Sequence, residues 1–161
     1  MYLDDTAHIL GSTEFFAICN LEQRRMLSFA SERVKLEEGE TLFISGEVVD
    51  GAYVLVSGEL MSKQLSGSNA DPIVISEPGT IIAELALITS HPRRSTLICK
   101  SEVELLMVPR AAFTKLMQQF PEIASYAREL VRTNIATYVN AIDEAKPKLT
   151  AKGSDFNPNS Q

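Results

Sequence analysis

The sequence predicts an α+β fold, in which a block of short strands lies between helices at the N-terminus and a long helix near the C-terminus. Two observations lead to this expectation. Between residues 34 and 108, six apolar and β-branched runs alternate with polar or glycine-containing breaks, which is typical of a sandwich or rolled barrel. On either side of this region, apolar residues recur at helical spacing instead.

The composition fits one globular domain. The 161 residues are 45% hydrophobic and 22% charged, which is enough for one core. The net charge of −6 argues against a general binder of DNA phosphates, and no apolar run approaches the roughly 20 residues of a membrane span. Cys19 and Cys99 have apolar neighbours and are expected to be buried thiols. We therefore expect a cytoplasmic protein that binds neither DNA nor membranes.

Residues 4–32 are expected to form short helices. Asn20 and Gln23 have the spacing of a capping box and would open the second of them. The apolar side of that helix would consist of Leu21, Met26, Leu27 and Phe29.

Six runs are the strand candidates, and polar loops such as "QLSGSNADP" separate them. These runs are "RVKL", "TLFI", "AYVLVSGELM", "PIVIS", "STLICK" and "VELLMV".

Helical spacing returns after Pro109, with a short helix to residue 120 and a longer one over 121–145. One apolar stripe follows the longer helix, through Ile123, Ala127, Val131, Ile135, Tyr138 and Ile142, with Leu130 alongside. The stripe either packs on its own domain or meets a second copy; its length favours a homodimer through this helix. Residues 146–161 are expected to be a disordered tail, which leaves one domain over 1–145.

The segment "IAELALITSHPRRST" carries the candidate chemistry. It places Glu84 in an apolar run and brings Arg93 and Arg94 after Pro92. We expect a short helix whose free amides near Ala83–Leu85 could bind an anion, helped by an arginine, while a carboxylate accepts from a sugar hydroxyl. The alternative is a structural ion pair between the carboxylate and an arginine.

Two motifs resemble those of cyclic nucleotide-binding domains, which occur in kinase regulatory subunits, gated channels and the bacterial catabolite activator family. "ELALITSHPR" (84–93) is similar to the family's phosphate-binding cassette, and "ISGEVVDGAYVLVSG" (44–58) is similar to its first hairpin. The resemblance covers about residues 13–145 and implies an antiparallel, jelly-roll-like β-roll over 34–108. The helix from Pro121 would then be a hinged lid.

The resemblance also implies roles for individual residues. Glu84 would accept from the ribose 2′-hydroxyl, and Arg93 would bind the exocyclic oxygens of the cyclic phosphate. The backbone amides of the pocket would be those of Ala83, Leu85 and Ala86.

The sequence departs from the family pattern beside these residues. Ala83 stands where a glycine is expected, and a positive φ is unfavourable for alanine. Arg94 and Ser95 follow Arg93 where small residues are usual, so a shifted register would make Arg94 and Ser95 the phosphate ligands. We expect Arg93 to bind phosphate, and Ser95 or Thr96 to add a hydroxyl contact.

The sequence therefore predicts a small stand-alone sensor of cAMP or cGMP that needs no other cofactor and signals to an unknown protein partner. An enzyme is not expected, because His8 and His91 are too few for a metal or catalytic cluster. A helix-turn-helix domain is not expected either. The alternative function is a ligand-free interaction module built on the same roll.

Overall fold

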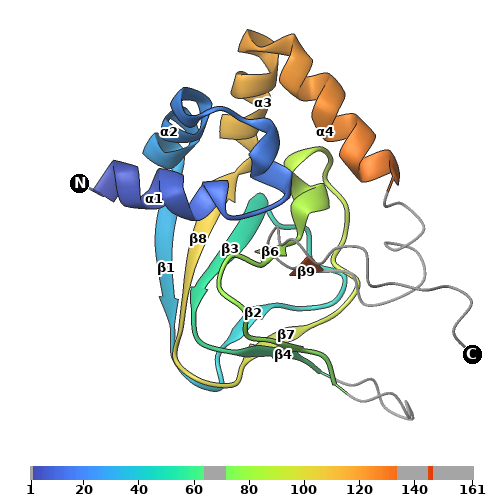
Figure 1. The fold of residues 1–161 in the computed structure, drawn as a ribbon. Helices are drawn as coiled ribbons and strands as arrows, with labels where there is room; N and C mark the ends of the chain where they lie inside the picture. Colours follow the sequence, from blue (N-terminus) through green and yellow to red (C-terminus); the bar gives the residue numbers. More distant parts are fainter. Residues whose placement is uncertain (1, 64–71, 134–144, 147–161) are drawn as a thin grey trace, which may run out of the picture.

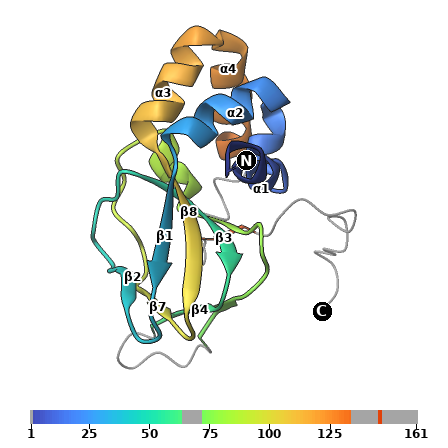
Figure 2. The ribbon, with the colours of Figure 1, turned by 90° about the vertical axis from the view of Figure 1, so that its left-hand side faces the viewer.

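The computed structural model describes residues 2–63, 72–133 and 145–146, and these form two antiparallel sheets with the helices gathered at one end (Figures 1 and 2). The predicted α+β class and the antiparallel roll are thus confirmed. Within these ranges, no helix has the length and apolar character needed to cross a membrane.

The two sheets differ in size and in position relative to the helices. Sheet A contains, in spatial order, β1 (Glu32–Leu36), β8 (Val103–Pro109), β3 (Gly51–Ser57), β6 (Ile81–Ile82) and β9 (Ala145–Lys146). Sheet B contains β2 (Thr41–Phe43), β7 (Leu97–Cys99), β4 (Leu60–Ser62) and β5 (Val74–Ile75). Each of the six predicted runs contains at least one strand, whereas β6 and β9, at two residues each, had no recognisable strand pattern.

Strands β3 and β8 are buried on both faces, which explains their nearly continuous apolar sequence. Val54 and Leu106 pack into a cluster with the helices, whereas Leu55 and Leu105 pack into a second cluster inside the roll. The alternation of side chains along a strand produces this division. Sheet A therefore forms a wall with the interior of the roll on one face and the helices on the other.

The N-terminal helices cover the outer face of this wall. They are α1 (Tyr2–Gly11), the 3-10 helix η1 (Phe15–Ile18) and α2 (Leu21–Ala30). The predicted capping box is confirmed, because the Asn20 side chain accepts from the Gln23 amide and the Gln23 side chain accepts from the Asn20 amide, both at 2.8 Å. Phe15 and Phe16 pack against each other, with ring centroids 5.3 Å apart.

The predicted apolar side of α2 is wrong in part. Leu27 is buried, but Leu21, Met26 and Phe29 are exposed, and Phe29 is 79% exposed. The buried face of α2 includes Gln23 and Ser28 instead, because the Gln23 side chain is held in the cap and Ser28 Oγ donates to the Arg24 carbonyl. Side-chain hydrogen bonds thus let polar residues occupy the inner face.

The C-terminal helices are α3 (Arg110–Gln119) and α4 (Pro121–Thr133). In α4, Ile123 and Ala127 are buried in the cluster shared with the N-terminal helices, so the stripe packs on its own domain at these two positions. Residues 134–144, including Ile135, Tyr138 and Ile142, and residues 147–161 lie outside the described residues. Residues 145–146 pair with β6 as a strand, which differs from the helix expected at residue 145 and the tail expected from residue 146. The bounds of the domain and of the tail stay predictions.

Cys19 and Cys99 are free and buried, as predicted. Burial raises the pKa of the Cys19 thiol to about 11, and the positive charge of Arg24 opposes this rise. The Arg24 guanidinium also donates to the Cys19 carbonyl at 2.6 Å. Cys19 is therefore held in its neutral form in the native state.

We expect Cys19 to make the protein less stable as the pH rises from 9 to 11. The unfolded thiol ionises near the ordinary pKa of 9.0, whereas the native thiol keeps its proton to about 11. Rising pH therefore favours the unfolded state, and the loss is about 2 kcal/mol near pH 10.5. Urea unfolding at pH 8 and 10.5 should show a smaller loss for Cys19→Ala than for the unmodified protein. Equal losses would contradict the assignment.

Candidate functional site

The candidate site begins with an abrupt turn from β6 into a short 3-10 helix, η2 (Glu84–Leu87). Ala83 makes the turn with φ 64° and ψ 42°, in the left-handed region. Among the described residues it is the one non-glycine with a positive φ. The predicted short helix is present, and Ala83 adopts the positive φ that was expected to be unfavourable for alanine.

Packing accounts for the conformation of Ala83. Its side chain is only 2% exposed and belongs to the cluster inside the roll. A left-handed residue that carries a Cβ costs about 1–2 kcal/mol, a strain that persists only where surrounding contacts define the backbone. The buried methyl group partly offsets this cost.

Replacing Ala83 by glycine is expected to leave the free energy of unfolding within about 1 kcal/mol of its original value. The relief of strain is offset by the lost methyl burial and by the greater freedom of the unfolded chain. Ala83→Val, which puts a β-branched residue in the same conformation, should cost about 2 kcal/mol or more. Urea unfolding of the two variants measures both effects. A large loss in Ala83→Gly would show that the methyl contact outweighs the strain.

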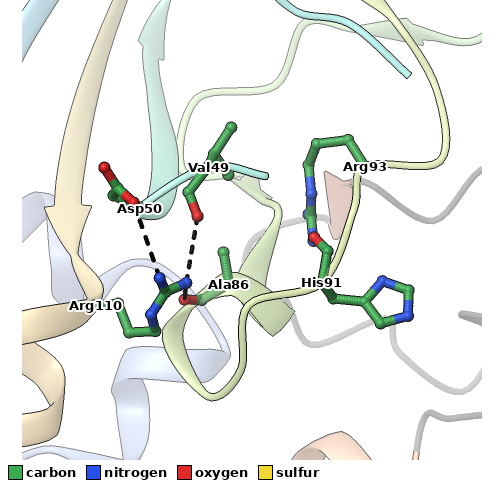
Figure 3. A network of polar contacts seen from close by, with 6 residues as sticks. All are labelled: Val49, Asp50, Ala86, His91, Arg93 and Arg110. Carbon is green, nitrogen blue, oxygen red and sulfur yellow. Dashed lines mark hydrogen bonds and ion pairs between the residues drawn. The ribbon is translucent and has the colours of Figure 1, made fainter. Parts of the chain in front are cut away.

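Two charged residues of the predicted site are buried. Glu84 is the first residue of η2 and is 8% exposed, whereas Arg93 is 4% exposed. Arg93 Nη2 donates to the carbonyl of His91 at 3.0 Å. Arg94, by contrast, is exposed. The structure thus separates the two neighbouring arginines into one buried and one surface residue (Figure 3 shows Arg93).

Hydrogen bonds on both sides fix the main chain of Arg93. Its amide donates to the Glu47 carbonyl at 2.7 Å, and its carbonyl accepts from the Gly46 amide at 2.8 Å. The Glu47 side chain in turn accepts from the Ile44 amide at 3.0 Å. The loop before β3, part of the second motif, therefore holds the arginine of the first motif in place.

The other predicted site residues differ in what they can offer a ligand. Ser95 is buried, and its Oγ has no hydrogen-bond partner among the described residues. Thr96 Oγ1 already accepts from the Ser45 amide at 2.9 Å. The Ala86 amide donates to the Ala83 carbonyl at 2.9 Å, so η2 uses one of the three amides expected to line the pocket. The amide of Leu85 precedes the first hydrogen bond of the short helix, where amides lack acceptors within the helix.

His91 is exposed, and its ring nitrogen lies 3.0 Å from the Pro92 carbonyl. Within the described ranges, no group of three or more His, Cys, Asp or Glu side chains could hold a metal ion.

Sequence reasoning missed Arg110. Its guanidinium donates to the carbonyl of Ala86 in η2 at 3.0 Å and to that of Val49 at 3.3 Å (Figure 3). The sequence around Arg110 contains no motif that indicates a binding role. The two carbonyl acceptors of its side chain lie 24 and 61 positions away in sequence.

The turn, the buried charges and the two antiparallel sheets define a domain of the β-roll class. The cyclic nucleotide-binding domain family matches residues 33–120, more than half of the chain. This chain belongs to the cyclic nucleotide-binding domain family.

Three relatives illustrate its range. The chain is 31% identical to lysophospholipase NTE1 of Saccharomyces cerevisiae over 147 residues, which is 81% of this chain but only 8% of the yeast protein. It is 26% identical to the cAMP-dependent protein kinase regulatory subunit of Dictyostelium discoideum, covering 82% of this chain and 40% of that protein. A solved cyclic nucleotide-binding-like protein from Brucella abortus is 31% identical, with a TM-score of 0.64 over 71% of this chain and 99% of its own.

Proposed function

We propose that the domain binds a purine 3′,5′-cyclic nucleotide, cAMP in preference to cGMP, and reports its presence to a protein partner. The observation that supports this most strongly is the burial of two charged side chains, those of Glu84 and Arg93. Both residues belong to the segment 84–93, which is similar to the family's phosphate-binding cassette. Burying a charged side chain costs free energy. A ligand that binds both the carboxylate and the guanidinium would account for the burial of these two side chains.

The proposed roles follow the chemistry of each group. Arg93 would bind the exocyclic oxygens of the phosphate through charge-assisted hydrogen bonds, and Glu84 would accept from the ribose 2′-hydroxyl. Ser95 Oγ, buried without a partner among the described residues, would donate to the phosphate. The amides of Ala83 and Leu85 would complete the anion site. Arg94, being exposed, is not proposed as a ligand.

Calorimetric titration with cAMP, cGMP and 2′-deoxy-cAMP tests the function and the role of Glu84 together. The unmodified protein should bind cAMP about tenfold or more tightly than 2′-deoxy-cAMP, because the deoxy ligand leaves the carboxylate without its hydroxyl partner. Glu84→Gln should weaken binding of cAMP and reduce this preference, since a neutral amide accepts less strongly. The absence of heat from all three nucleotides at millimolar concentration would refute the function.

Signalling would pass through α3 and α4, the helices that follow the roll. A ligand shifts such elements only if it binds two of their arrangements with different affinity. The homodimer through 121–145 remains a prediction, and residues 134–144 of that segment lie outside the described ranges. The proposed role is regulatory and not catalytic. The proposed location is a reducing compartment such as the cytoplasm, which agrees with the two free thiols.

The second candidate is a ligand-free interaction module, and the surface of α2 favours it. Phe29 is 79% exposed, and Met26 lines a cavity of about 390 Å³ between α2 and α3. An exposed apolar surface of this kind is typical of protein contacts. In this case Glu84 and Arg93 would serve to stabilise the turn, and the titrations above would detect no binding.

A further inference from the structure

Arg110 lies where the roll ends and the C-terminal helices begin. It is the first residue of α3 and directly follows Pro109, the last residue of β8. Its amide donates to the carbonyl of Asp50 at 2.7 Å, so its main chain is fixed against the start of β3. Its side chain is 26% exposed, which leaves most of it between neighbouring segments.

The guanidinium of Arg110 connects α3 to two segments that are distant from it in sequence (Figure 3). Nη1 donates to the carbonyls of Ala86 in η2, at 3.0 Å, and of Val49 before β3, at 3.3 Å. Nη2 lies 3.8 Å from a carboxylate oxygen of Asp50. Because the Asp50 side chain is 92% exposed, that ion pair contributes little, and the two carbonyl contacts dominate.

The bond to Ala86 reaches the centre of the proposed ligand site. The same residue donates its amide to the Ala83 carbonyl, so one peptide segment belongs both to the strained turn and to the contact with Arg110. Behind this polar contact, Leu87 of η2 and Phe113 of α3 belong to the same apolar cluster. A displacement of η2 therefore either moves α3 with it or breaks the hydrogen bond.

We propose that Arg110 is the positioning residue that transmits movement of η2 to α3 and α4. The inference rests on the proposed function, since a nucleotide in the site supplies the movement. The apolar contact alone is not directional, whereas the hydrogen bond fixes the carbonyl of η2 relative to the first turn of α3.

Three variants separate this role from general packing. Arg110→Met keeps the apolar stem and removes every side-chain donor, whereas Arg110→Lys keeps the positive charge on a single donor nitrogen. Lys115→Met, at an exposed position of α3, is the matched control for loss of a positive charge.

Hydrogen exchange of the ligand-free proteins tests the link itself. Peptides covering 84–89 and 110–119 should exchange about tenfold faster in Arg110→Met than in the unmodified protein. Arg110→Lys should lie between the two, and Lys115→Met should match the unmodified protein. Unchanged exchange of both peptides in Arg110→Met would overturn the proposal.

Exchange with saturating cAMP tests transmission. In the unmodified protein, cAMP should slow exchange in 84–89 and change it in 110–133. In Arg110→Met, which should still bind cAMP by calorimetry, the change in 84–89 should persist while that in 110–133 falls at least threefold. An undiminished change in 110–133 would overturn the proposal. If the unmodified protein does not bind cAMP, the proposed function fails, and the ligand-free comparison alone decides whether Arg110 links the two segments.

Discussion

Replacing Arg93 by alanine is expected to weaken cAMP binding by about a hundredfold or more. Each charge-assisted hydrogen bond contributes about 1.5–3 kcal/mol, and a guanidinium can make two such bonds to a phosphate. Two bonds at the lower limit already correspond to more than a hundredfold change in the dissociation constant. Calorimetric titration of the variant measures the loss.

Arg94→Ala is the matched control for this experiment. The two arginines are adjacent and carry the same charge, but Arg93 is 4% exposed and Arg94 is exposed. Arg94→Ala should therefore change the dissociation constant less than threefold, an amount attributable to long-range attraction. Loss of binding in Arg94→Ala with retention in Arg93→Ala would show that the register is shifted by one residue. Circular dichroism of Arg93→Ala must match the unmodified protein for the comparison to hold.

Gly58→Ala is expected to destabilise the fold by about 3 kcal/mol or more. Gly58 links β3 of sheet A to β4 of sheet B and has φ +95°, a conformation that L residues rarely adopt. A Cβ there would lie 2.2 Å from the carbonyl oxygen of Glu102 and 2.8 Å from the Cα of Val103. Backbone strain and overpacking add, and the main-chain atoms cannot move without disturbing β8. Urea unfolding monitored by circular dichroism measures the loss.

Gly39→Ala separates the two causes. Gly39 has a similar φ of +89°, but a Cβ at this position would meet nothing within 4 Å. Its replacement should therefore cost only the conformational part, about 1–2 kcal/mol. Equal losses in the two variants would mean that the close contact at Gly58 is relieved at little cost.

The parts of the fold that depend on neighbours in sequence could be predicted. The capping box needs only two side chains three positions apart, and the strands β3 and β8 need only long apolar runs. The strand β6 could not be predicted, because its apolar residues continue into a mixed pattern, and β9 could not, because it lies at the end of a helical pattern. The pairing of β9 with β6 depends on chain segments more than 60 positions apart, Ile81 facing Lys146.

Burial on α2 shows a different limit. Helical spacing identified apolar residues on α2, but it did not show which side the rest of the domain would cover. Leu27 lies inside, whereas Phe29 lies in solvent while Gln23 is buried. The predicted capping bond satisfies the polar group of Gln23, but the side of the helix that is buried depends on how the helix packs.

The sequence indicated candidate residues for the site but not the contacts that hold them. The motif indicated Glu84 and Arg93, and the structure places both side chains out of solvent. The contacts that hold them belong to tertiary structure. The loop at Gly46 and Glu47 fixes Arg93, and Arg110 reaches η2 from the far side. No local pattern in the sequence encodes such distant pairs.

The two main-chain hydrogen bonds of Arg93 also have a kinetic consequence. Gly46 and Glu47 form hydrogen bonds to its carbonyl and its amide in the ligand-free protein, so ligand binding does not require this segment to become ordered first. The rate of association should then vary little among related nucleotides, and differences in affinity should appear as differences in residence time.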